Sequence, residues 1–150
     1  MDPINNILLE SIKPGSYDVG YTCLLIPCLP SCHLQGSLAE GLPQWMKQIC
    51  TPHHWGLEFS TIDADYFQWG LRVPPSMQSS QFMQVIRQGT SKLILSTFEH
   101  IRKEISVNDF WAPGYLVVLG SRPQSKEMAK QYIRMLRRRQ EFASPDLQNI

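Results

Sequence analysis

Residues 62–75 have the sequence IDADYFQWGLRVPP, and this stretch decides the fold of the chain. Apolar side chains occupy every second position from Phe67 to Val73, with Gln68, Gly70 and Arg72 between them. Such alternation is typical of a β-strand with one face in the core. The prolines at 74 and 75 end the strand, because proline cannot donate to the hydrogen-bond ladder.

Residues 55–60 alternate in the same way, which predicts a partner strand joined to the first by a hairpin around residues 63–65. Two further stretches are rich in β-forming residues and predict strands over about 20–29 and 114–120. The sheet is therefore expected to have four strands.

Three helices are predicted between and after these strands. Apolar residues at helical spacing cover about 38–51, where Ser37 and Glu40 form a capping-box pattern. A second helix is expected to begin at Ser79 or Ser80 and to be interrupted near Gly89. The last helix begins near Ser125.

The order strand, helix, strand, strand, helix, strand, helix predicts an α+β fold. It is the split βαβ plan of a ferredoxin-like sandwich, an antiparallel sheet with helices on one face plus an extra C-terminal helix. We expect an N-terminal arm at 1–19, a folded domain at 20–142 and a flexible tail at 143–150.

The bulk composition narrows the function classes. The 150 residues carry a formal net charge of only +1, which argues against a uniformly basic nucleic-acid-coating protein but leaves room for a local basic face. No stretch has the roughly 18 apolar residues of a membrane span, and the chain is expected to be cytoplasmic, with its four cysteines reduced. A zinc site at Cys28, Cys32 and His33, completed by His53 or His54, is a weaker alternative because no second ligand pair has suitable spacing.

Three blocks resemble the single-tyrosine HUH transposases of small bacterial insertion sequences, the IS200-like domain. Residues 62–75 are similar to a segment that in the family has an aspartate, then His-hydrophobic-His, then a strand ending in Pro-Pro. Residues 80–92 resemble the family helix that leads into a Lys/Arg-Gly-x-Ser turn, and residues 110–120 resemble its Trp-x-x-Gly-Tyr strand. The pair Tyr132-Ile133 matches the start of the family motif Tyr-Ile-x-x-Gln.

This resemblance implies metal-assisted phosphoryl transfer on single-stranded DNA, with Tyr132 as the candidate nucleophile. In such enzymes the tyrosine attacks a backbone phosphorus and leaves a 5′-phosphotyrosine and a free 3′-hydroxyl. A Mg²⁺ or Mn²⁺ ion, held by the two histidines and the glutamine, polarises the phosphate. The family commonly works as a homodimer in which helix and metal site come from different subunits.

The expected metal-ligand positions are altered in this chain. Tyr66 and Gln68 stand where the family has histidines, and Leu136 stands four residues after Tyr132, where it has glutamine. A neutral phenol and an amide oxygen replace imidazole poorly, and leucine ligates nothing. No metal or other cofactor is therefore expected, unless Asp63 and Asp65 supply oxygen ligands instead. Tyr132 is then either a retained nucleophile position or a packed aromatic.

Basic residues are a separate signal. They are candidates for nucleic-acid contacts, and single-stranded or hairpin DNA is the expected partner. The candidates on the second and last helices are Arg87, Lys92, Lys126, Lys130, Arg134, Arg137, Arg138 and Arg139. A solvated helix face is the alternative reading, and Tyr66 and Trp111 are further candidates for stacking on unpaired bases.

Three functions remain open from the sequence. The first is a transposase-family DNA-binding protein with lost or greatly reduced tyrosine strand cleavage. The second is a transposase that is still active through an atypical metal site. The third is a ferredoxin-like dimer that serves as an interaction or ligand-binding module without a DNA role.

Overall fold

The computed structural model describes residues 18–105 and 108–148, and its centre is the strand β3 (Phe67–Val73). β3 pairs antiparallel with β2 (Gly56–Ile62) on one side and with β1 (Val19–Leu25) on the other. β4 (Leu116–Leu119) pairs antiparallel with β1, so the strand order is β2-β3-β1-β4. The predicted hairpin and the four-stranded antiparallel sheet are confirmed.

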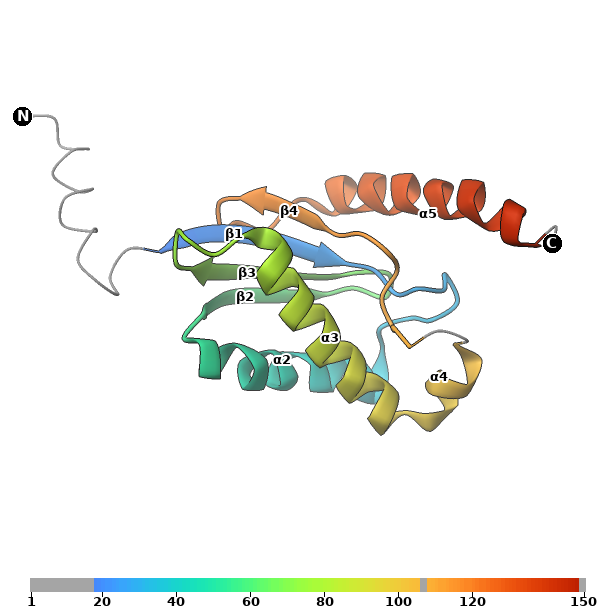
Figure 1. Ribbon diagram of the computed structural model, residues 1–150, viewed down its shortest axis with the longest axis horizontal. Helices are drawn as coiled ribbons and strands as arrows, with labels where there is room; N and C mark the ends of the chain where they lie inside the picture. Colours follow the sequence, from blue (N-terminus) through green and yellow to red (C-terminus); the bar gives the residue numbers. More distant parts are fainter. Residues whose placement is uncertain (1–17, 106–107, 149–150) are drawn as a thin grey trace, which may run out of the picture.

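Helices cover both faces of this sheet (Figure 1). α2 (Gly36–Cys50) and α3 (Ser79–Thr97) lie on one face, and the short α4 (Glu99–Glu104) follows α3. α5 (Lys126–Gln148) lies on the opposite face. The α+β, ferredoxin-like class with an added C-terminal helix is therefore confirmed.

Each face of the sheet has its own hydrophobic core. Alternation along β1 places Cys23 and Leu25 in the larger core under α2 and α3, and Leu24 in a smaller cluster under α5. Because α5 covers the second face, β3 is buried on both sides and only Arg72 of its residues is exposed. The prediction of a half-buried strand is wrong for β3, whereas β2 alternates between half-buried and exposed residues.

Several predicted boundaries are corrected. α2 begins at Gly36, with Gln35 as its N-cap, so Ser37 lies inside the helix and no side chain caps it. α3 begins after Gln78, whose backbone N–H donates to the Gln81 side chain at 2.9 Å, so neither Ser79 nor Ser80 is the cap. β1 ends at Leu25 rather than near residue 29.

The last helix begins as expected. The Ser125 hydroxyl accepts from the backbone N–H of Met128 at 3.2 Å, as an N-cap does. α5 then continues to Gln148, so it includes most of the predicted tail at 143–150. The flexibility of that tail stays a prediction, and most of the arm at 1–19 lies outside the described residues.

The Gly89 break is also wrong, for a reason in the packing. α3 runs unbroken through Gly89, and a Cβ there would lie 2.8 Å from Cδ1 of Ile49 on α2. Glycine at this position lets the two helices approach closely rather than ending one of them. The break comes instead at Phe98, whose extended backbone separates α3 from α4.

Gly70 on β3 gives a testable packing prediction. A Cβ there would lie 2.4 Å from both Cε1 of Phe59 and Oγ of Ser121. Gly70→Ala is expected to lower the free energy of unfolding by about 2 kcal/mol in urea denaturation, because overpacking forces neighbouring groups to move. Gly56→Ala is the matched control, since its Cβ would meet only Cβ of Arg72 at 3.4 Å. Equal stability of the two variants would contradict the prediction.

Candidate functional site

Tyr132 lines a groove between α5 and the turn that precedes β4. The groove has a volume of about 370 Å³ and its lining includes Tyr115, Met135, Leu136 and Arg139. Tyr132 is half-buried, and this burial raises the pKa of its phenol to about 12, although Arg87 and Arg139 act in the opposite direction. The hydroxyl is therefore protonated at neutral pH and can donate a hydrogen bond.

The three altered positions come together under α5. Tyr66 and Leu136 are 4% and 8% exposed and belong to one hydrophobic cluster with Leu24, which Tyr132 and Ile133 flank. Burial raises the pKa of the Tyr66 phenol further from neutrality, with Asp63 adding to the effect and Lys126 opposing it. The cluster therefore consists of neutral groups.

Gln68 has a structural partner of its own. It is 1% exposed, and its Oε1 accepts a hydrogen bond from the backbone N–H of Gln124 at 2.7 Å. Gln124 lies just ahead of the first turn of α5, so this bond ties the end of the loop to the sheet. The amide thereby fixes the position of the helix that carries Tyr132.

The two aspartates of the β2–β3 turn also have partners. Asp63 Oδ2 lies 3.5 Å from Nζ of Lys126, and Asp65 Oδ1 lies 3.2 Å from Nδ1 of His33. Within residues 18–105 and 108–148, no group of three or more His, Cys, Asp or Glu side chains has the arrangement of a metal site. The same holds for the alternative zinc site at Cys28, Cys32 and His33, and the four cysteines are free.

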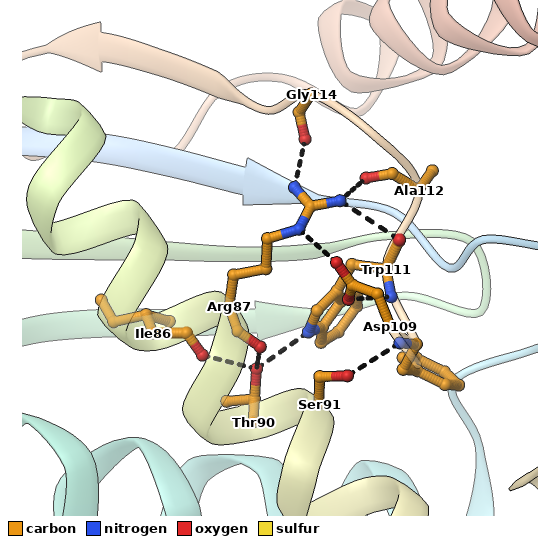
Figure 2. A network of polar contacts seen from close by, with 9 residues as sticks. Ile86, Arg87, Thr90, Ser91, Asp109, Trp111, Ala112 and Gly114 are labelled. Atoms are coloured by element: carbon orange, nitrogen blue, oxygen red, sulfur yellow. Dashed lines mark hydrogen bonds and ion pairs between the residues drawn. The ribbon is translucent and has the colours of Figure 1, made fainter. Parts of the chain in front are cut away.

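Arg87 holds the wall of the groove from the other side of the sheet (Figure 2). Its Nε donates to Asp109 at 2.8 Å, and its terminal nitrogens donate to the backbone oxygens of Gly114 at 2.9 Å, Trp111 at 3.2 Å and Ala112. Five bonding partners could not be assigned to it from local sequence, and four are present. Arg87 therefore fixes the segment that leads into β4.

The same segment is held by two hydroxyl groups of α3. The Trp111 indole N–H donates to Thr90 Oγ1 at 2.8 Å, and the backbone N–H of Phe110 donates to Ser91 Oγ at 2.8 Å (Figure 2). Trp111 is 1% exposed, so it is a core residue. Neither Trp111 nor the buried Tyr66 presents a ring for stacking, and the exposed ring of this region belongs to Tyr115, which sequence reasoning missed.

Comparison with known proteins identifies the family. The family model described as "Transposase IS200 like" matches residues 16–135. The chain belongs to this family. No curated protein matches the sequence.

Two solved structures share the fold of this IS200-like chain. One is a protein of Deinococcus radiodurans R1, described as a "putative transposase", with a TM-score of 0.67 and 18% identity over 84% of this chain and 94% of that one. The other is a REP-associated tyrosine transposase bound to a REP hairpin, with a TM-score of 0.50 and 6% identity over 77% of this chain and 62% of that one. At these identities the likeness concerns the fold.

The donor set of this IS200-like chain does not fit Mg²⁺ or Mn²⁺. Its three positions carry a buried neutral phenol at Tyr66, an amide bonded to the backbone at Gln68, and an aliphatic side chain at Leu136. These ions require several oxygen or imidazole ligands, at least some of them anionic. Sequence alone indicated the substitutions, and the structure adds that the replacing side chains are packed.

The cationic candidates of the IS200-like chain fall into two groups. Arg87 is bonded as described, and Arg137 donates to the backbone oxygens of Pro27 at 2.8 Å and Cys28 at 3.2 Å. The second group is exposed to solvent and consists of Lys92, Lys126, Lys130, Arg134, Arg138 and Arg139. In this group Lys126, Lys130, Arg134 and Arg138 follow one another at four-residue spacing and so form a stripe along α5.

Proposed function

We propose that this IS200-like protein binds single-stranded or hairpin DNA and has lost, or nearly lost, metal-dependent strand cleavage by Tyr132. The observation that carries the loss is the packing of Tyr66 and Leu136 in an apolar cluster beside Gln68, which is bonded to Gln124. Without a metal, the transition state for phosphodiester cleavage lacks charge neutralisation worth several kcal/mol.

DNA binding is supported by charge placement and by one relative. The α5 stripe offers Lys130, Arg134 and Arg138 to solvent at a spacing that one phosphate backbone can follow. The REP-associated transposase that shares the fold was solved with a DNA hairpin. We assign the phosphate contacts to the stripe and exclude Arg87 and Arg137, because their guanidinium groups already hold the protein together.

The other properties inferred from the family belong to the same proposal. A homodimer and a cytoplasmic location follow from the resemblance and the composition, and size-exclusion chromatography with light scattering tests the first. No helix in the described ranges is long and apolar enough to cross a membrane. The alternative of an active atypical metal site is less well supported, because Asp63 and Asp65 are engaged with Lys126 and His33.

The test of lost cleavage combines binding and chemistry. The protein is incubated with a labelled DNA hairpin carrying single-stranded flanks, with Mg²⁺ or Mn²⁺, and analysed by fluorescence anisotropy and denaturing gel. We expect binding without a covalent protein–DNA adduct, for wild type and Tyr132→Phe alike. Because anisotropy shows that DNA is bound, absence of an adduct reports absence of chemistry. A metal-dependent adduct in wild type that disappears in Tyr132→Phe would overturn the proposal.

A further inference from the structure

The groove beside Tyr132 is lined by apolar and aromatic surface with a cation at its edge. The apolar and aromatic part comes from Pro113, Tyr115, Tyr132, Met135 and Leu136, and the lining contains Arg139 but no acidic residue. Its volume, about 370 Å³, is in the range of small-ligand pockets. This composition suits a planar, uncharged ring attached to an anionic group.

The position of the groove favours a nucleotide as that ligand. Arg139 directly follows Arg138, the last member of the α5 stripe, so a backbone that follows the stripe leads to the groove. Tyrosine rings stack on any base, because every base has a π face. A nucleotide therefore matches both the apolar lining and the charge beside it.

We propose that this groove holds one unpaired nucleobase against the rings of Tyr115 and Tyr132, with the attached phosphate on Arg139. The inference rests on the proposed DNA binding and names its single-stranded element. Where a metal-dependent relative brings a phosphate to its tyrosine, this chain presents Leu136 and Met135, which suit a base. Tyr132 changes role accordingly, from nucleophile to neutral hydrogen-bond donor.

The walls of the groove are rigid enough to select a ligand. Arg87 holds the carbonyl of Gly114, and Gly114 has φ +87°, a conformation that L side chains rarely adopt. On the other side, Gln140 Nε2 donates to the Cys28 carbonyl at 3.2 Å and its Oε1 accepts from Arg137 at 2.8 Å. Gln140 thus serves as a fixed wall, and the free polar groups are the Tyr132 hydroxyl and Arg139.

Two methionines of α5 provide an internal comparison. Met135 lines the groove and is 54% exposed, whereas Met128 is 51% exposed and lies outside the groove lining. Protein with ¹³C-labelled methionine methyl groups is titrated with millimolar deoxyadenosine 5′-monophosphate or, as a base-free probe, 2-deoxyribose 5-phosphate. We expect the ring current of the base to shift the Met135 methyl resonance, with Met128 unchanged and little effect from the base-free probe.

Three outcomes of this titration would overturn the inference. They are no shift of Met135, an equal shift with 2-deoxyribose 5-phosphate, and an equal shift of Met128. Resonances are assigned with Met135→Leu and Met128→Leu.

A second measurement uses DNA and separates the two proposals. A hairpin with one unpaired adenine next to the stem is compared with the same hairpin carrying an abasic nucleotide there. We expect the base to raise affinity about tenfold, and Tyr115→Leu, which keeps apolar volume but removes the aromatic face, to abolish that gain. Equal affinity of the two hairpins would refute the pocket and leave hairpin binding intact. No hairpin binding, with a Met135 shift by the mononucleotide, would refute the proposed function and leave the pocket.

Discussion

Replacement of Arg87 by methionine is expected to lower the free energy of unfolding by about 3 kcal/mol in chemical denaturation. The substitution removes an ion pair to Asp109 and leaves the carbonyls of Trp111, Ala112 and Gly114 without their donor. The Arg87 side chain is 17% exposed, so water replaces these bonds poorly. Asp109 is 40% exposed and keeps part of its hydration, which holds the loss below that of a fully buried pair.

The matched control for Arg87 lies on the same helix. Lys92→Met removes one positive charge from an exposed position of α3, and it should change stability by less than about 0.5 kcal/mol. If both variants lose the same stability, net charge rather than the bonds to residues 109–114 is responsible. A stable Arg87→Met protein would show that α3 and β4 are held mainly by the Thr90 and Ser91 hydroxyls.

The course of the chain was largely predictable because its signals are local. Alternation in residues 67–73 and helical spacing in 38–51 depend on neighbours only a few positions away, and both elements are present with boundaries within a few residues. Turn and helix-end signals were less reliable. Gly89 was predicted as a helix break, but its lack of a side chain serves contact with Ile49.

The site was only partly predictable because its partners are remote. Sequence placed Tyr66, Gln68 and Leu136 at the altered ligand positions, yet their burial depends on α5 lying over β3. Arg87 and Arg137 looked like surface cations in the sequence. Their acceptors are 22 to 27 and up to 110 residues away, so no local pattern could separate them from the exposed cations of the stripe.

Reversal of Lys130, Arg134 and Arg138 to glutamate is expected to weaken hairpin binding by roughly 100-fold at about 0.1 M salt. All three side chains are exposed on α5, so the substitutions should leave the fold intact. Each phosphate contact that is lost also removes a released counterion, so the slope of log affinity against log salt should become shallower by about two to three units. Anisotropy titrations at several salt concentrations measure both quantities.

The control for this reversal separates a local contact from overall charge. Lys47, Arg102 and Lys103 are also exposed, and their reversal to glutamate changes the net charge equally, but they lie on α2 and α4, across the sheet from α5. Long-range attraction depends on net charge and is screened within about 10 Å at 0.1 M salt. The control variant should therefore lose only a few-fold in affinity and keep its salt slope. Equal losses in the two variants would mean that DNA does not follow α5, whereas a loss confined to the stripe assigns phosphate contacts to the helix that carries Tyr132.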